Sequence, residues 1–321
     1  MNMPAKLKQG DEIRVIAPSR SLKILSDEGI QLAKSRLEDL GFKVTFGKYV
    51  GVCDLQSSSS IEQRVEDLHE AFADKNVKGI LTVIGGFNSN ELLPYIDYEL
   101  VRANPKILCG FSDITALTTA ITAKCDFITY SGPHFSSFQM TGMQDYQTTH
   151  FKKCLMNEEA YEVVPSSKWS DDLWFLDQDN RLYEESKWKV YSEGEATGEL
   201  FGGNLCTLNL LQGTEYMPEL NNCILFVEDD ELITPELFAR DLTSLLQVTK
   251  GLRGLLIGRF QRVSKVTEEQ IHFILDKHPQ LKDIPVFYDI DFGHTQPIAT
   301  LPIGGTVRID SNGMKFEMIK F

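Results

Sequence analysis

The sequence predicts an α/β protein with a mostly parallel sheet that carries helices on both faces. The first half of the chain alternates short apolar runs with stretches in which apolar residues recur at helical spacing. Strands and helices in this order require right-handed crossover connections, which build parallel sheets. The same alternation returns in the last third. Because a domain holds roughly 150 residues, the length of 321 residues favours two domains.

The first half is expected to contain four strands and four helices. The stripe of Ile30, Ala33 and Leu37, followed by Gly41, is typical of a helix that ends at a glycine. The expected strands cover residues 13–18, 42–46, 79–84 and 106–110, and the expected helices cover residues 28–40, 61–73, 91–95 and 113–123. Ligands of such sheets bind beyond the carboxyl ends of the strands, so reactive residues are sought there.

The middle of the chain, residues 166–191, has little periodicity and holds all three tryptophans, Trp169, Trp174 and Trp188. Long connections in compact domains are usually functional or disordered. Disorder is disfavoured here because tryptophans usually find packing partners. Two interpretations stay open: a substrate loop, or a strand pair whose tryptophans only pack.

The last third predicts a second set of strands and helices. Pro235 stands where a proline opens a helix, and Asn312-Gly313 is a hairpin signal. The expected strands cover residues 223–227, 254–258, 285–288, 306–310 and 315–319, and the expected helices cover residues 205–211, 235–246 and 268–277.

Composition excludes several classes of function. The formal net charge is −14 and the pI is about 4.9, which disfavours nucleic acid and anionic membranes as partners. An anionic small molecule stays open, because a local pocket can oppose the overall charge. No apolar run approaches the roughly 20 residues that span a bilayer. The six cysteines stand singly without a CxxC pair, which favours reduced thiols, no bound metal and a cytoplasmic protein.

One strand end has the pattern of a nucleophile. Gly110-Phe111-Ser112-Asp113 joins an expected strand directly to an expected helix, as in the nucleophile elbow G-x-S-x-G. Such a turn exposes the hydroxyl, and the free N–H groups of the helix start can stabilise an oxyanion. Ile114 replaces the last glycine of the motif, and Ser112 could equally be an ordinary helix N-cap.

A serine nucleophile needs a base and a residue that orients the base. His294 lies in a loop after the strand at 285–288, and His134 is the other histidine in a glycine-containing loop. Glu228 follows a buried strand, with Asp229, Asp230 and Glu231 as competitors. The chain order Ser112, Glu228, His294 is the order of α/β-hydrolases. No P-loop or dinucleotide fingerprint is present, so no cofactor is expected. A Mg²⁺ site at the acidic run is a weaker alternative.

The chain resembles the LD-carboxypeptidase family along nearly its whole length. The shared motifs, in family order, are Val15-Ile16-Ala17-Pro18-Ser19, Ile84-Gly85-Gly86-Phe87, Leu92-Leu93-Pro94-Tyr95, Gly110-Phe111-Ser112-Asp113-Ile114-Thr115, Gly132-Pro133, Gly202-Gly203-Asn204-Leu205, Leu225-Phe226-Val227-Glu228-Asp229, Phe292-Gly293-His294 and Leu301-Pro302-Ile303-Gly304. The resemblance implies a flavodoxin-like N-terminal domain (residues 1–165), a tryptophan-bearing substrate loop (166–191) and a smaller α/β C-terminal domain (192–321).

The resemblance also implies roles for single residues. Ser112 would be the nucleophile, His294 the general base and Glu228 the acid that orients it. The backbone N–H groups of Asp113 and Gly86 would form the oxyanion hole. Candidate substrate-binding residues in the same motifs and in the loop are Gly85, Asn88, Trp174 and Asn204.

Two features make the chain similar to the microcin C immunity peptidase branch (MccF-like). Ile84 stands where murein-processing members tend to carry an arginine, and the 166–191 insertion bears tryptophans. That branch cleaves the amide between an amino acid and an adenylate mimic, and a loop tryptophan stacks on the adenine. The implied function is an amidase acting on aminoacyl-nucleotides, as a homodimer. The alternatives are an LD-carboxypeptidase that trims murein tetrapeptides and a small-molecule binding protein without activity.

Overall fold

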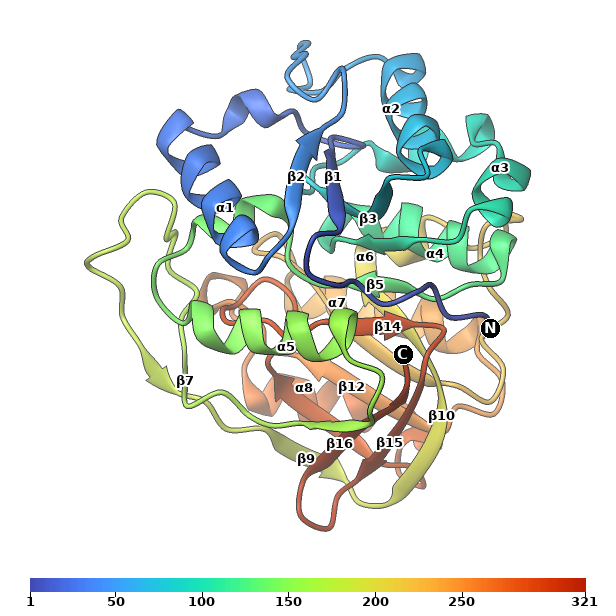
Figure 1. Cartoon of the computed structure of the whole chain (residues 1–321). Coiled ribbons are helices and arrows are strands. Elements are labelled where there is room, and N and C mark those ends of the chain that lie inside the picture. Colours follow the sequence, from blue (N-terminus) through green and yellow to red (C-terminus); the bar gives the residue numbers. More distant parts are fainter.

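The computed structural model describes all residues from 1 to 321 and contains two main sheets (Figure 1). The first sheet has the order β14-β5-β4-β3-β1-β2. Its strands are β1 (Glu12–Ile16), β2 (Lys43–Phe46), β3 (Val77–Thr82), β4 (Ile107–Cys109), β5 (Thr129–Ser131) and β14 (Leu301–Ile303). All neighbours are parallel except β14, which runs antiparallel to β5. The order β2-β1-β3-β4-β5 is that of flavodoxin-like sheets, whose ligands bind where the order reverses, between β1 and β3.

Five α-helices and several 3₁₀ helices surround this sheet. The α-helices are α1 (Asp27–Asp39), α2 (Ile61–Ala73), α3 (Tyr98–Ala103), α4 (Thr115–Cys125) and α5 (Gln144–Met156). The helix expected at 91–95 is a 3₁₀ helix, Ser89–Tyr95, with Pro94 inside it. Proline lacks the N–H that a longer α-helix would need. The sequence pattern did not predict α3, α5, β5 or β14.

The second sheet has the order β6-β16-β15-β10-β11-β12-β13-β9. Its strands are β6 (Tyr161–Val163), β9 (Lys189–Ser192), β10 (Glu195–Asn204), β11 (Ile224–Glu228), β12 (Gly254–Gly258), β13 (Val286–Ile290), β15 (Thr306–Asp310) and β16 (Lys315–Lys320). The four strands from β10 to β13 are parallel, and the outer strands are antiparallel. Its α-helices are α6 (Leu205–Asn209), α7 (Pro235–Val248) and α8 (Glu268–Leu275). The predicted α/β class with parallel strands is confirmed.

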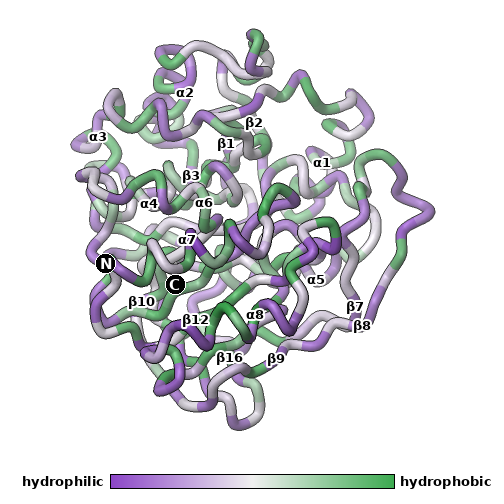
Figure 2. Tube along the Cα trace, turned by 180° about the vertical axis from the view of Figure 1, so that it is seen from behind, coloured by the Kyte–Doolittle hydropathy of each residue, from purple (hydrophilic) through white to green (hydrophobic).

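The two sheets share one hydrophobic core. A single cluster of 78 buried residues includes members of both sheets, and the hydrophobic stretches concentrate in the interior of the fold (Figure 2). Each sheet also contains a strand from the other half of the chain. β14, from the last part of the chain, pairs with β5 in the first sheet, and β6, from the first half, pairs with β16 in the second sheet. The two sheets are thereby fixed relative to one another. None of the helices combines the length and apolar character that a bilayer crossing requires.

The insertion at 166–191 forms a small strand pair and a projecting loop. β7 (Lys168–Trp169) and β8 (Glu184–Glu185) pair antiparallel, and the chain between them extends away from the body of the molecule (Figure 1). Trp169 and Trp188 are buried, whereas Trp174 in the projecting part is half-buried. The strand pair that the sequence left open is thus present, with two of the three tryptophans packed against the fold.

Candidate active site

Ser112 lies on a strained turn between β4 and α4. Its φ angle is 61°, in the left-handed region that non-glycine residues rarely adopt. The turn passes close to β3, because a Cβ on Gly110 would lie 2.3 Å from Thr82 Oγ1 and 3.0 Å from Ile114 Cγ2. A side chain at position 110 would therefore collide with Thr82, and Ile114, at the position of the motif's last glycine, is buried. The strain is the expected feature of an exposed nucleophile.

The Gly85-Gly86 loop after β3 lies directly against this turn. A Cβ on Gly85 would lie 3.1 Å from Ser112 Oγ and 3.5 Å from the backbone nitrogen of Asp113. The N–H groups of Gly86 and Asp113 donate no hydrogen bond within the protein. Two unpaired backbone donors beside a serine hydroxyl are what an oxyanion hole requires. The two predicted oxyanion residues lie on the two segments that meet at Ser112, and their role stays a prediction.

The Asp113 carboxylate ties the glycine loop to the turn. It is buried, and its Oδ2 atom accepts hydrogen bonds from Ser19 Oγ at 2.6 Å and from the backbone N–H groups of Asn88 and Ser89 at 3.1 and 2.9 Å. Ser89 Oγ donates to the Asp113 carbonyl at 2.6 Å. The side chain of Asp113, which the sequence pattern gave no role, thus joins the turn at Ser112 to the segment that follows Gly86.

The second sheet supplies the other two residues of the predicted triad. Glu228 is the last residue of β11, and His294 follows β13. His294 Nε2 lies 3.0 Å from Ser112 Oγ, and His294 Nδ1 lies 2.6 Å from Glu228 Oε2. Glycines make room for the acid, since a Cβ on Gly293 or Gly258 would lie 2.6–2.8 Å from Glu228 atoms. The three residues form a continuous hydrogen-bonded chain.

Charge dominates the environment of His294. Burial alone would lower its pKa, but Glu228, with its hydrogen bond, and the nearby Asp230 and Asp229 outweigh burial and raise the pKa of His294 to about 9. An opposite charge favours the protonated ring, which explains this direction. The Glu228 Oε1 atom is buried and has no hydrogen-bond partner. The imidazolium form is therefore strongly stabilised, as is needed once the histidine has taken a proton.

Two predicted substrate-binding asparagines have protein partners in this structure. Asn204 caps α6 by accepting from Thr207 N, and its amide donates to Asp229 Oδ1 at 3.3 Å. Asn88 donates from its amide to Gln56 at 3.3 Å and accepts from Ser19 at 3.3 Å. Both are buried. Their role in substrate binding stays a prediction.

Asp229 and His134 are buried titratable groups next to the triad. Burial, with the charge of Glu228, raises the pKa of Asp229 to about 7. Burial lowers the pKa of His134 to about 3, so this ring stays neutral. Phe111 lies between the two histidines, with ring centroids 4.4 Å from His134 and 5.2 Å from His294. His134 thus supports the turn, and His294 is the histidine that reaches Ser112.

The tryptophan insertion is anchored beside His294. Backbone hydrogen bonds of 2.9 and 2.8 Å join Ser170 to Gln296, two residues beyond the histidine. Asp291, fully buried, binds Arg259 at 2.8 Å and accepts from Trp188 Nε1 at 2.9 Å. The base of the insertion is therefore held rigidly at the edge of the site.

Trp174 differs from the other two tryptophans. The ring of Trp169 lies under the Arg259 and Arg262 guanidinium groups, at 5.0 and 5.3 Å, and Trp188 bonds to Asp291. Trp174 contacts the ring of Phe175 at 5.9 Å, and Phe175 is itself 64% exposed. Trp174 is thus less packed than the other two tryptophans, and its role in substrate binding stays a prediction.

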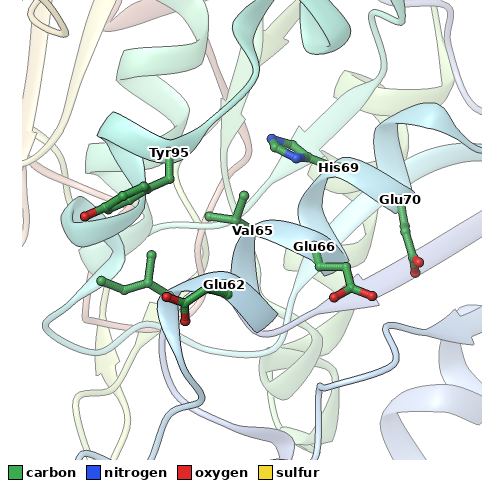
Figure 3. A pocket seen from close by; sticks show the side chains of 7 residues that line it. Glu62, Val65, Glu66, His69, Glu70 and Tyr95 are labelled. Carbon is green, nitrogen blue, oxygen red and sulfur yellow. The ribbon is translucent and has the colours of Figure 1, made fainter.

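Two cavities lie apart from the Ser112–His294–Glu228 chain. One of about 380 Å³ lies along α2, where Glu62, Glu66 and Glu70 project from successive turns near His69 and Tyr95 (Figure 3). His69 Nε2 accepts from Asp97 N at 2.9 Å, so its acceptor is occupied. The other, of about 410 Å³, is lined by residues 231–236, Val263, Ser264, Lys265 and Gln270. No cluster of three or more His, Cys, Asp or Glu side chains has a metal-binding arrangement.

Comparison with protein families finds a match over most of the chain. The LD-carboxypeptidase N-terminal domain matches residues 13–132, and the LD-carboxypeptidase C-terminal domain matches residues 197–309. The putative carboxypeptidase YocD of Bacillus subtilis is 51% identical over 96% of this chain and 95% of that protein. A probable murein peptide carboxypeptidase of B. subtilis is 30% identical over 96% of this chain and 91% of that protein.

Solved structures match the fold equally well. An MccF-like protein from Bacillus anthracis superposes with a TM-score of 0.98 at 48% identity, and the match covers 100% of both chains. The microcin C7 self-immunity protein MccF of Escherichia coli is 32% identical over 96% of this chain and 93% of that protein. Its complex with aspartyl sulfamoyl adenosine superposes with a TM-score of 0.89 at 30% identity, covering 100% and 99% of the two chains. The chain thus belongs to the LD-carboxypeptidase family of serine peptidases, in its MccF-like branch, and is a hydrolase of the serine carboxypeptidase type.

Proposed function

We propose that the chain is a serine amidase that hydrolyses the amide between an amino acid and a nucleotide, with Ser112 as nucleophile, His294 as general base and Glu228 as the acid that orients the base. The observation that carries this proposal is the unbroken hydrogen-bonded chain from Ser112 Oγ through His294 to Glu228, at 3.0 and 2.6 Å. The free N–H groups of Gly86 and Asp113 beside Ser112 support it.

The reaction follows from these positions. His294 Nε2 takes the Ser112 proton as the hydroxyl oxygen attacks the aminoacyl carbonyl, and the resulting oxyanion accepts from the Gly86 and Asp113 N–H groups. The imidazolium then gives its proton to the leaving nitrogen, the C–N bond breaks, and the acyl group stays on Ser112. Water, deprotonated by His294, attacks the ester and releases the amino acid. Each oxyanion donor is typically worth about 3 kcal/mol in the transition state.

The insertion supports a nucleotide as the leaving group. A flat base gains about 1–3 kcal/mol from stacking on an aromatic side chain, without hydrogen-bond readout. Trp174 is half-buried and not committed to packing, so it is our candidate for that contact. MccF has been solved with aspartyl sulfamoyl adenosine and, as a tryptophan-to-phenylalanine mutant, with adenosine monophosphate.

The second candidate is an LD-carboxypeptidase that removes terminal D-Ala from murein tetrapeptides. The same Ser112–His294–Glu228 chain would perform that reaction, and the 30% identity to a probable murein peptide carboxypeptidase favours it. Family membership sets aside the third hypothesis, a binding protein without activity.

We further propose that the enzyme acts as a homodimer in the cytoplasm. The insertion carries four large apolar side chains that are more than half exposed: Leu173, Phe175, Leu176 and Leu182. An apolar patch of this kind is typical of protein interfaces. All six cysteines are free, which suits a reducing compartment. Sedimentation of wild type and a Phe175→Ser variant tests the dimer, since a monomer in both would contradict it.

A paired assay tests the function. Purified wild type, Ser112→Ala and the control Ser192→Ala are incubated with aspartyl sulfamoyl adenosine or with a murein tetrapeptide ending in D-Ala, and products are identified by mass spectrometry. Ser192 donates to the Lys282 carbonyl, far along the chain from the triad, so the control removes a hydroxyl elsewhere. Release of sulfamoyl adenosine by wild type and Ser192→Ala alone is the expected result. Release of D-Ala alone selects the second candidate, and equal activity in Ser112→Ala contradicts the triad.

A further inference from the structure

Arg20 lies at the switch point of the first sheet, beside the oxyanion loop. It follows β1, and its backbone N–H donates to the Gly85 carbonyl at 3.4 Å. A Cβ on Gly86 would lie only 3.0 Å from Arg20 Cγ. Gly85 in turn lies against Ser112 Oγ. The side chain of Arg20 therefore begins next to the atoms that would hold the oxyanion, at the place where flavodoxin-like sheets bind ligands.

The Arg20 guanidinium has no anionic partner in the protein. It forms no ion pair and no side-chain hydrogen bond, and it lies over the ring of Phe87, 5.3 Å from the ring centroid. Phe87 is 69% exposed. By contrast, Arg64 near the same loop binds Glu91 at 2.6 Å and two backbone carbonyls. Arg20 is thus a half-buried cation held over an aromatic ring with all its donors unused.

A free arginine at this position has a clear use. The protein carries a net charge of −14, which repels anionic ligands. A guanidinium offers two parallel N–H groups that match a carboxylate, and contact with an aromatic face restricts its motion before binding. Arg20 and Ser112 both pack against the Gly85-Gly86 loop, so the groups that the guanidinium would bind belong to the residues on either side of the scissile bond.

We propose that Arg20 binds a carboxylate of the substrate adjacent to the scissile amide and thereby selects anionic substrates. This inference rests on the proposed function, because the scissile amide is located by Ser112 as the attacking nucleophile. The carboxylate has two sources: the side chain of an acidic aminoacyl group, or the terminal carboxylate of a leaving D-amino acid.

The test measures binding, so it does not depend on turnover. Calorimetry of the Ser112→Ala protein compares aspartyl with asparaginyl sulfamoyl adenosine, and a murein tetrapeptide with its terminal amide. The same four ligands are titrated into Ser112→Ala combined with Arg20→Gln, Arg20→Lys or Arg20→Glu. The control combines Ser112→Ala with Lys23→Gln, which removes an exposed positive charge three residues away. Circular dichroism and thermal melting confirm that each variant is folded.

We expect Arg20→Gln to weaken binding of the carboxylate member of one pair by about 10- to 100-fold, the range of a charge-assisted hydrogen bond. The amide member should change less than twofold. Arg20→Lys should recover part of the preference, and Arg20→Glu should reverse it. The pair that responds identifies the source of the carboxylate.

Equal losses for the carboxylate and amide members would reduce Arg20 to a packing residue and overturn the proposal, as would an unchanged preference in Arg20→Gln. Failure of the proposed function looks different: wild type would then turn over neither substrate, while the binding preference and its dependence on Arg20 would still be measured.

Discussion

The two halves of the active site are built by different means. The nucleophile half, from the first sheet, uses close packing and neutral donors: Ser112 has a positive φ, glycine lies against it, and the Asp113 carboxylate binds a hydroxyl and two backbone N–H groups. The acid–base half, from the second sheet, concentrates charge, with Glu228, Asp229 and Asp230 all acting on His294.

The two halves should therefore respond to different substitutions. The nucleophile half positions Ser112 and the backbone N–H groups beside it, so it should be sensitive to changes in side-chain volume and hydrogen bonding. The acid–base half sets the pKa of His294, so it should be sensitive to changes in charge. Neither half holds the whole predicted triad, because Ser112 follows a strand of one sheet and His294 follows a strand of the other.

The largest expected effect tests whether the halves act as one unit. Ser112→Ala and His294→Ala should each lower kcat by about 10⁴-fold or more, and the double variant should lose no more than either single variant, because triad residues are strongly non-additive. Single-turnover rates on the preferred substrate measure this. Losses that multiply in the double variant would mean that the two sheets contribute independently.

The second prediction concerns charge in the acid–base half. Since the pKa of His294 is raised to about 9, the ring is protonated at neutral pH and must lose its proton to act as base. kcat/KM should therefore rise with pH through a midpoint near 9 and level off above it. Glu228→Gln removes the largest favourable charge, so the midpoint should fall toward or below the ordinary value of 6.5, while the plateau drops about 10³- to 10⁴-fold.

A matched control separates this effect from general loss of charge. Glu231→Gln removes a carboxylate three residues further along the same acidic run, and it should leave the midpoint within a few tenths of a pH unit. A midpoint that stays near 9 in Glu228→Gln would assign the raised pKa to another carboxylate. The raised pKa also contributes stability that is complete below pH 6.5 and is lost as the pH rises through about 9.

The third prediction concerns geometry in the nucleophile half. Asp113→Ala removes the acceptor that joins Ser19, Asn88 and Ser89, so the Gly86 N–H should leave its position and kcat should fall about 10²-fold with little change in KM. Asp113→Asn keeps one acceptor oxygen and should recover most of the rate. The control Asp97→Ala removes a carboxylate that caps α3 and should lower stability only. If Asp113→Ala raised KM by as much as it lowered kcat, the result would indicate that the whole Gly85-Gly86 loop has lost its structure.

The sequence predicted the parts of the fold and site that depend on local pattern. Apolar periodicity identified most strands and helices, and the turn at Ser112 followed from glycine and serine placed at a strand end. Strand ends also pointed to Glu228 and His294, because parallel strands align their carboxyl ends. The structure brings these three residues together at hydrogen-bonding distance.

Contacts between segments far apart in the chain could not be predicted, because no local sequence pattern encodes them. β14 pairs with β5 across about half the chain, and three residues of β5 are too few for a clear pattern. α5 carries buried polar residues such as Gln147 and His150 on its inner face, which weakens its apolar stripe. The Asp113 carboxylate and the unpaired Arg20 gain their meaning only from neighbours far along the chain.

The smallest expected effect on activity concerns the insertion, where Trp169 and Trp188 are buried and Trp174 is only half-buried. Trp188 is buried and donates to Asp291, so Trp188→Ala should destabilise the protein by about 3–5 kcal/mol, measured by chemical denaturation.

Trp174→Ala should leave stability within about 0.5 kcal/mol, because its ring contacts little of the fold. The same change should raise KM for aminoacyl sulfamoyl adenosine about tenfold, the lower part of the range for one stacked base, and leave the murein tetrapeptide unaffected. A Trp174→Phe variant should recover part of the loss, since it keeps an aromatic face. Equal KM changes for both substrates would show that Trp174 shapes the loop rather than stacking on a base.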